Sequence, residues 1–525
     1  MTKDTAVYTV ITFAPVQGFI EKTRKLRDLY GASLILSHLS YRVVQEASKT
    51  VEVISPGNPS LQKGMPNRIL LKGEFSQQQI ESVLLSGWKE LLYECRTWVE
   101  QKVPDNYHWG REWDNLGNHA WEIFWGHGAT ISAAMEDLEN RKLGRSWTGL
   151  NWIGESSSLT GADAIAFPGL GGVDRNPNNR VWQSEKTTIE KFYKRLGEVL
   201  EPNNRAKQAE ISLVAENEKI SITELVKRLI AIDSTGIAKK LNIPRLGDSF
   251  SDIYRRPEKT DGTQKGRWTG WFMGDGDKVG DFLKEKAKLA NGHEEIKSFS
   301  NAMRRWGDEF AKSFRKDIGR IIYAGGDDFL GVIYSEKHED AIKPEQALDW
   351  LIKLPEEWSK HGQKITVSVG FVWAGHSVPQ RDILQHCKDA QKQAKSTGRD
   401  RVTIRIVFNS GQYIEWTCPW SNLNILNDYQ DREGNKNWSH IYTDLAQLEA
   451  RNAFNINQPT SDGKRLALDF LDIYFPGWGK KIKDYKFAEK LIGYTENDSE
   501  SERTEKTIEW IQNLIKVGWQ LCSNI

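Results

Sequence analysis

The sequence predicts an α+β protein built on two ferredoxin-like domains, and three observations predict it. Apolar runs and helical patterns follow one another in the order βαββαβ over residues 5–130. The same order returns over residues 266–410. The stretches that follow these two regions show mainly helical periodicity. We therefore expect a first ferredoxin-like domain at 1–144, a mostly helical middle domain at 145–265, a second ferredoxin-like domain at 266–416 and a C-terminal helical domain at 417–525.

In the first domain, short apolar runs predict strands and longer periodic stretches predict helices. Pro15 ends the first strand, because proline has no N–H to give to a sheet ladder. The expected strands are at residues 7–13, 51–54, 66–71 and 120–125, and the expected helices are at 17–44 and 77–103.

The middle and C-terminal regions are expected to be helical. In the middle region, Gly- and Ser-rich loops at 147–161 and 169–179 alternate with helices at 189–200 and 222–241. In the C-terminal region, helical spacing predicts helices at 423–429, 442–454, 467–474 and 504–521.

The second domain follows the same logic. A strand at 268–273 is followed by helices up to about residue 315, a β-hairpin at 321–334, a helix at 345–358, a β-branched strand at 365–373, a helix at 381–396 and a strand at 402–408.

Composition limits the functional classes. The chain has 525 residues, of which 38% are hydrophobic and 27% charged, so it can form several buried cores. No apolar run is long enough for a membrane span, and the first residues lack a signal-peptide pattern, so we expect no membrane partner. The four cysteines are far apart without a CxxC pair, which suits a reducing cytoplasm. A net charge of +1 neither favours nor excludes nucleic acid.

Two carboxylates lie at the tip of the hairpin at residues 321–334, hereafter the GGDD hairpin. Apolar strands flank Gly325, Gly326, Asp327 and Asp328. Adjacent strand residues point to opposite faces, but at a turn both carboxylates can approach one cation. The two glycines have no Cβ, so a polyphosphate could lie close to their backbone.

A second acidic stretch ends the strand at 268–273. Asp275, Gly276 and Asp277 follow this strand directly, and a helix is expected next. Carboxylates here and at the GGDD hairpin can converge on two Mg²⁺ ions about 3.5–4 Å apart, as in phosphoryl transfer. Each piece alone also fits an ordinary turn, because Asp-Gly is common in turns. The two together favour a site for metal and nucleotide.

A basic cluster follows the helix at 381–396. Lys395, Arg399 and Arg401 could neutralise triphosphate oxygens opposite the acidic residues. They could also be the cations that a helix C-terminus favours, with Gly398 as the residue after the cap, and the cluster taken alone favours this interpretation. The residues alone leave both interpretations open.

At this point the chain resembles a known family. The stretches that show the resemblance are, in chain order, APVQGFIEKTRKLRDLYGASLILSHLS, MPNRILL, WFMGDGDKVGDFL, YAGGDDFLGVI and ITVSVGFV with AKSTGRDRV. They are similar to the large palm-containing subunit of type III CRISPR effector complexes, most like the Cmr branch. The resemblance implies two ferredoxin-like palm (polymerase/cyclase) domains. It also implies partners: crRNA and target RNA within an assembled complex, and other CRISPR effector subunits.

The resemblance implies an antiviral nucleotidyltransferase that makes cyclic oligoadenylate from ATP when target RNA is bound. Asp275, Asp327 and Asp328 would bind two Mg²⁺ or Mn²⁺ ions, while Lys395 and Arg399 would hold phosphates. Gly276, Gly325 and Gly326 would line the nucleotide site. The first palm would be catalytically degenerate. When the strands are aligned on the apolar pairs that follow them, Thr12 and Ala14 fall where Asp275 and Asp277 lie.

Two departures from the family pattern qualify this expectation. Many relatives begin with an HD nuclease domain, whereas this chain starts at the palm and has no His-Asp pair, so we expect no DNase activity. The stretch GESSSLTGA has serines where relatives have zinc-binding cysteines, so zinc is not expected there. Two alternatives stay open: a catalytically idle scaffold subunit of the same complex, and a GGDEF-like diguanylate cyclase.

Overall fold

The computed structural model describes the chain from residue 7 to residue 523, with several gaps. The gaps are residues 24, 60, 62–63, 146–154, 162, 173–182, 202–212, 216–217, 244–252, 254, 256–265, 336–340 and 455–459. Much of the predicted loops at 147–161 and 169–179 therefore lies outside the described residues.

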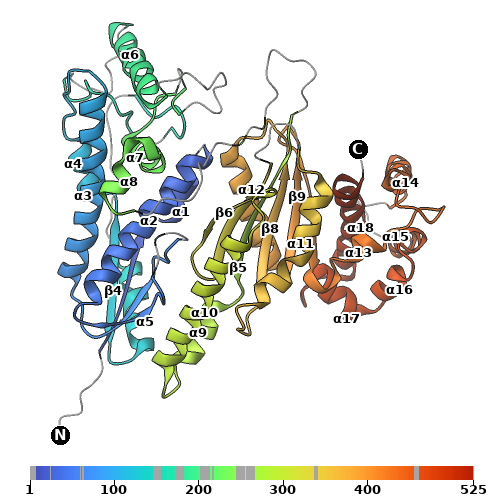
Figure 1. Cartoon of the computed structure of the whole chain (residues 1–525). Helices are drawn as coiled ribbons and strands as arrows, with labels where there is room; N and C mark the ends of the chain where they lie inside the picture. Colours follow the sequence, from blue (N-terminus) through green and yellow to red (C-terminus); the bar gives the residue numbers. More distant parts are fainter. Residues whose placement is uncertain are drawn as a thin grey trace. The chain divides into compact units, whose positions relative to one another are not determined.

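The chain forms two compact units, each assembled from separate segments (Figure 1). The first unit comprises Met1–Tyr254, Gly280–Ala311 and Ile322–Gly326, and the second comprises Arg255–Val279, Lys312–Ile321 and Asp327–Ile525. The boundaries of the four predicted domains stay a prediction.

The first unit contains a four-stranded sheet with the order β2-β3-β1-β4. Central strand β1 pairs antiparallel with both β3 and β4. This order, with helices between the first and second and between the third and fourth strands, is ferredoxin-like, so the predicted fold is confirmed here. The strands are β1 (Tyr8–Ala14), β2 (Glu52–Ser55), β3 (Ile69–Lys72) and β4 (Glu122–Gly128).

Both faces of this sheet are covered, because successive strand residues point to opposite sides. Ile11 and Phe13 pack in the core formed with α2 (Leu26–Ala47) and α3 (Gln77–Lys102). Val10 points the other way and packs in a smaller core with residues of α5 (Ile131–Leu143) and α10 (Gly292–Ser313). The remaining helices are α4 (Glu112–His119), α6 (Gln183–Leu200), α7 (Ile222–Ala231), a short 3₁₀ turn (Asp233–Thr235) and α8 (Ile237–Lys240).

The single helix expected at 17–44 is wrong, because the chain breaks into α1 (Gln17–Glu21) and α2. The residue before α2, Lys25, has an extended backbone. The ammonium group of Lys227 donates to the carbonyl oxygens of Phe19 (2.6 Å) and Lys22 (3.4 Å) at the end of α1. These donors satisfy carbonyl groups that an unbroken helix would bond internally. Burial lowers the pKa of Lys227 to about 8.

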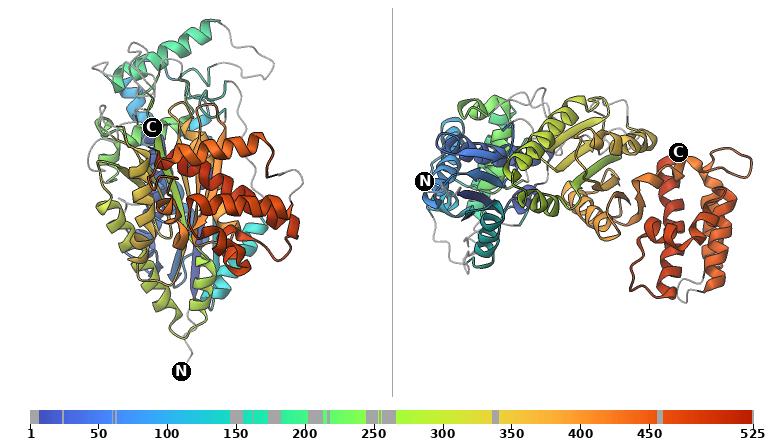
Figure 2. Two further views of the ribbon diagram at one scale, coloured as in Figure 1. Left: turned by 90° about the vertical axis from the view of Figure 1, so that its right-hand side faces the viewer. Right: turned by 90° about the horizontal axis from the view of Figure 1, so that it is seen from below.

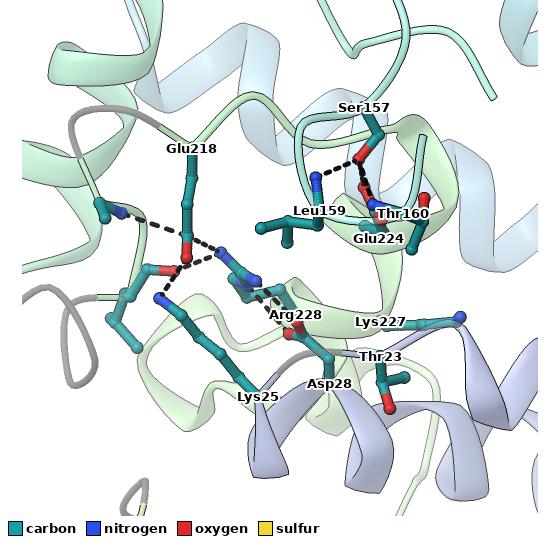
Figure 3. A network of polar contacts seen from close by, with 12 residues as sticks. Thr23, Lys25, Asp28, Ser157, Leu159, Thr160, Glu218, Glu224, Lys227 and Arg228 are labelled. Atoms are coloured by element: carbon teal, nitrogen blue, oxygen red, sulfur yellow. Dashed lines mark hydrogen bonds and ion pairs between the residues drawn. The ribbon is translucent and has the colours of Figure 1, made fainter. Parts of the chain in front are cut away.

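Helices α2 and α7 are joined by a buried network of charges (Figure 3). The guanidinium of Arg228 donates to both carboxylate oxygens of Asp28, at 2.9 and 2.6 Å, and the two side chains are almost fully buried. Arg228 also contacts Glu218 at 2.9 Å, and Glu218 contacts Lys25 at 3.1 Å. Buried charges need this degree of pairing, because each would otherwise lose its hydration without replacement.

The described part of the GESSSLTGA stretch is held by hydrogen bonds to α7 and to the segment just before it. The hydroxyl of Ser157 donates to the carboxylate of Glu224 at 2.6 Å and accepts from the Leu159 N–H at 3.1 Å (Figure 3). The hydroxyl of Ser158 accepts from the Lys219 N–H at 2.9 Å. Serine hydroxyls, as both donors and acceptors, can join a loop to a helix in this way.

A six-stranded sheet, in the order β10-β9-β8-β5-β7-β6, lies mainly in the second unit. Its part β6-β7-β5-β8 repeats the order of the first sheet, which confirms the second predicted ferredoxin-like motif. Strand β9 is added parallel to β8. The strands are β5 (Thr269–Gly276), β6 (Gly319–Ala324), β7 (Asp328–Ile333), β8 (Val367–Ala374), β9 (Arg401–Val407) and β10 (Tyr413–Pro419).

Strand β10 corrects the prediction that residues from 417 onward are helical. Residues 414–418 alternate apolar and polar side chains, which is a strand pattern that the prediction missed, and the backbone pairs with β9 along seven residues. The local pattern indicates the strand, whereas its place at the sheet edge beside β9 comes from the tertiary pairing. The helices that connect the strands of this sheet along the chain are α9 (Val279–Ala287), α10, α11 (Pro344–Ser359) and α12 (Gln380–Ser396).

Helices follow β10, and they lie side by side as a group in both views of Figure 2. The long helix α18 packs on β9 and β10. No helix in the described ranges is long and apolar enough to cross a membrane. The bounds are a 3₁₀ turn (Trp420–Asn422), α13 (Ile425–Asp428), α14 (Trp438–Ala450), α15 (Ser461–Tyr474), α16 (Trp478–Lys483), α17 (Tyr485–Ala488), a short π-helix (Glu489–Gly493) and α18 (Glu500–Cys522).

Candidate functional site

Two of the predicted acidic residues lie directly opposite each other. Strands β5 and β7 pair antiparallel with Asp275 across from Asp328. The Gly276 N–H donates to the Asp327 carbonyl oxygen at 2.9 Å, so Gly276 and Asp327 form a hydrogen-bonded pair. Because the two kinds of pair alternate, Asp275 and Asp328 form the closer kind, with Cα atoms about 4.5 Å apart. Their carboxylates therefore leave the same face of the sheet as neighbours.

The third acidic residue, Asp327, belongs to the other face. A Cβ built on its partner Gly276 would lie 3.1 Å from the Asp327 Cβ, so the two residues share that face. Asp327 precedes the first residue of β7, at the end of the sheet. Its carboxylate can reach the Asp275 side only around this end, as expected for a turn residue. Asp327 is half-buried and Asp328 is exposed.

The two glycines of the GGDD hairpin have different surroundings. Gly325 is buried, and its carbonyl oxygen accepts a hydrogen bond from Arg304 at 2.9 Å. Gly326 is half-buried, and a Cβ built there would meet no atom within 4 Å. The backbone at Gly326 therefore has the open space that an approaching phosphate needs, while Gly325 is packed.

The predicted basic residue Lys395 reaches the acidic pair. It lies in the last turn of α12, and its ammonium group forms an ion pair with the carboxylate of Asp275. Burial and then the positive charge of Arg399 hold the pKa of Lys395 below its ordinary value. A half-buried cation beside a carboxylate can be exchanged for a metal ion or turned toward a phosphate.

The helix-end interpretation fits part of the basic cluster. The Arg399 N–H donates to the Ala394 carbonyl oxygen at 3.1 Å, and Gly398 has a φ of +128°, which together form a Schellman-type helix end. Arg401 is buried and donates to the carbonyl oxygens of Arg399 and Lys490. Gly398 and Arg401 thus shape the turn, while Arg399 is exposed on it.

Asp277 is a residue of this region whose position the sequence did not reveal. Its buried carboxylate accepts from the hydroxyls of Thr366 (2.8 Å) and Ser368 (2.6 Å) and from the Asp400 N–H (3.0 Å). It therefore fixes the turn that follows α12 against the end of β5. The signal that could have revealed this role is Thr366 and Ser368, two polar residues at alternate positions of the otherwise apolar run at 365–373.

The acidic pair fits a hard divalent cation. In the part of the chain that the structure describes, no three His, Cys, Asp or Glu side chains gather closely enough to hold a metal ion. Mg²⁺, however, is commonly held by one or two carboxylates together with substrate phosphates and water. Asp275 and Asp328 supply two such carboxylates, and the ammonium group of Lys395 already places positive charge on Asp275.

The matching end of the first sheet has neutral polar groups instead. The amide of Asn67 donates to the hydroxyl of Thr12 at 3.1 Å and to the Phe13 carbonyl oxygen at 3.2 Å. Thr12 is the residue that the sequence aligns with Asp275. A neutral amide–hydroxyl pair is a poor ligand for a divalent cation compared with two carboxylates.

Comparison with known proteins gave two family matches. Residues 269–403 match Cas10/Cmr2, second palm domain, and residues 8–61 match CRISPR-associated protein Cmr2, N-terminal. These matches confirm the predicted resemblance to the large palm-containing subunits of type III CRISPR effector complexes. No curated protein matches the chain in sequence.

One type III-B structure shares the fold at low sequence identity, and two further solved structures are similar to the chain. A type III-B Cmr-beta structure in its apo state has 12% identity and a TM-score of 0.58, with 98% of this chain and 82% of that chain covered. A Csm1–Csm4 subcomplex of a type III-A complex has 13% identity and a TM-score of 0.49, with 99% and 70% covered. Csm1 of T. onnurineus has 12% identity and a TM-score of 0.47, with the same coverage.

Proposed function

Because the chain carries the second palm domain of the Cas10/Cmr2 family and matches the Cmr2 N-terminal region, we propose that it is the large subunit of a crRNA-guided type III CRISPR complex. In this proposal, its second palm makes cyclic oligoadenylate from ATP when target RNA is bound. The observation that carries the proposal is the facing pair Asp275 and Asp328, which lies inside the matched region beside Lys395.

The reaction joins the ribose 3′-hydroxyl of one ATP to the α-phosphorus of the next. The bond between the α-phosphorus and the bridging oxygen breaks, and pyrophosphate leaves with the electron pair. Metal ions bound by the carboxylates would activate the hydroxyl and stabilise the charge on the phosphates. Asp275 and Asp328 would hold them from one face, and Asp327 would complete the set around the end of the sheet.

The basic and glycine residues would orient the substrate. Lys395 would leave Asp275 and contact a phosphate once a metal ion takes its place, so the carboxylate would keep a positive neighbour. Arg399, exposed on the turn that Asp277 fixes, would hold a further phosphate. The open space at Gly326 would admit the phosphate chain.

The test uses the assembled complex with target RNA, Mg²⁺ and labelled ATP. We expect cyclic product from the unaltered complex and a loss of about 10³-fold or more in Asp275→Ala and Asp328→Ala, because each removes a metal-binding carboxylate. Asp382→Ala serves as the matched control, since Asp382 is an exposed carboxylate in the first turn of α12. Equal product from all four complexes would refute the proposal.

One observation favours a second candidate, a catalytically idle scaffold subunit. The ion pair between Lys395 and Asp275 already neutralises one carboxylate of the pair. The scaffold role predicts full assembly on crRNA and target RNA but no cyclic product at any Mg²⁺ or Mn²⁺ concentration. A parallel reaction with GTP and no RNA tests the diguanylate cyclase alternative, which requires product under those conditions.

A further inference from the structure

A buried arginine holds the backbone of the GGDD hairpin. The side chain of Arg304, on α10, is 2% exposed. Its Nη1 group donates to the carbonyl oxygen of Gly325 at 2.9 Å and also to that of Gly64, in the loop between β2 and β3. One guanidinium nitrogen thus joins two loops that are far apart in sequence. Charged donors form stronger hydrogen bonds than neutral ones, and burial strengthens them further.

The two carbonyl groups belong to a tight backbone contact. A Cβ built on Gly64 would lie 3.6 Å from the Gly325 Cα and 3.4 Å from the Tyr323 Cβ. Gly64 also has a φ of +88°, which an L side chain rarely adopts. Gly64 therefore lies directly on the GGDD hairpin, and Arg304 bonds to both from α10.

Helix α10 is itself fixed to the same loop one turn earlier. The hydroxyl of Ser300 accepts from the Gly57 N–H at 2.8 Å and shares a hydrogen bond with the Ser55 hydroxyl at 3.2 Å. Ser300 and Arg304 are four residues apart, so they lie on one face of the helix. The helix thus presents the guanidinium from a fixed position, rather than from a flexible surface side chain.

We propose that Arg304 is a positioning residue for the reaction: through the Gly325 carbonyl it fixes the peptides that set the directions of Asp327 and Asp328. This inference rests on the function proposed above. Only two peptide units separate Gly325 from Asp327, so a rotation at Gly325 displaces both carboxylates. Through Gly64, the same contact makes the geometry of the carboxylates depend on the loop between β2 and β3.

The experiment compares Arg304→Met and Arg304→Lys with the matched control Arg305→Met in the assembled complex. Arg305 is the next residue on α10 and is exposed. We measure amide hydrogen exchange in peptides that cover residues 322–330, together with kcat and KM for ATP and the Mg²⁺ concentration for half-maximal rate. Thermal unfolding of each complex shows whether the variant is folded.

In Arg304→Met, we expect exchange of the amides at residues 325–328 to be roughly tenfold faster, because the local opening free energy falls. We expect kcat to fall by about 10²-fold with KM for ATP nearly unchanged, as a misplacement of about 1 Å would cause. The Mg²⁺ requirement should rise. Arg304→Lys, which keeps a charged donor, should restore part of each change, and Arg305→Met should change none.

Each result decides the proposal. Unchanged exchange at residues 325–328 in Arg304→Met would overturn it, as would faster exchange with unchanged kcat. If Arg304→Met does not fold, the same readouts in Arg304→Lys decide. If the unaltered complex makes no product, the proposed function fails on its own, and exchange alone then shows whether Arg304 holds the hairpin.

Discussion

The ammonium group of Lys395, on α12, forms an ion pair with the carboxylate of Asp275, on β5. The chain separates these residues by more than one hundred positions. The cation that the sequence placed near a helix end is therefore part of the acidic cluster.

Replacing Lys395 with alanine should weaken the use of ATP while leaving assembly intact. The substitution removes a cation that can follow the phosphates, so we expect KM for ATP to rise by about tenfold, the value of one charge-assisted hydrogen bond of about 1.4 kcal/mol. Lys392→Ala, an exposed lysine on the same helix, is the control. An unaltered KM would show that Lys395 does not contact the phosphates and only neutralises Asp275.

Asp277→Ala should destabilise the second unit. It leaves the Thr366 and Ser368 hydroxyls and the Asp400 N–H without their acceptor, at a cost of about 3 kcal/mol. We expect a lower melting temperature and faster hydrogen exchange at residues 398–401. Asp281→Ala, on α9, should leave the exchange at these residues as it is. A melting temperature equal to that of the unaltered chain would contradict the role given to Asp277.

Asp28→Asn should destabilise the first unit by about 3–5 kcal/mol, because it leaves the buried Arg228 guanidinium without its main counter-charge. Denaturation measured by a probe in the first unit checks this. Asp105→Asn, which removes a more exposed partner of Arg195, is the comparison and should cost about 1 kcal/mol or less. Similar losses of unfolding free energy for both substitutions would contradict this prediction.

His38 should make the free energy of unfolding depend on pH below about 6.5. Burial, and next the charge of nearby Arg42, lower the pKa of this histidine to about 4, while Glu90 opposes the shift. The unfolded chain binds the proton at about pH 6.5 and the folded chain only near pH 4. Stability is therefore full above pH 6.5 and falls as the pH drops, by about 3 kcal/mol in total.

The check is the free energy of unfolding from pH 7 to pH 4 for the unaltered chain and for His38→Gln. Glutamine cannot take up the proton, so the variant should lose about 3 kcal/mol less over this range. His361, whose pKa burial also lowers to about 4, remains in both proteins and cancels in the difference. Parallel curves would show that His38 does not contribute.

Local sequence predicted much of the second sheet. The β-branched run at 365–373 and the apolar runs on either side of Gly325 and Gly326 show strand patterns. Such a pattern extends over only a few neighbouring residues, so it can be recognised from the local sequence. The helix bounds at 77–103 and 381–396 agree with α3 and α12 to within one residue. The local pattern did not predict the break between α1 and α2, where the Lys227 ammonium group, about two hundred positions later, donates to a carbonyl oxygen of α1.

The sequence by itself determined the repeated βαββαβ order and the acidic, basic and glycine residues that can carry phosphate chemistry, since periodicity and residue type are local properties. Only the tertiary structure decided which side chains meet. The register of β5 and β7 places Asp328, rather than Asp327, opposite Asp275. A shift of one residue would reverse that choice, because adjacent side chains on a strand point to opposite faces.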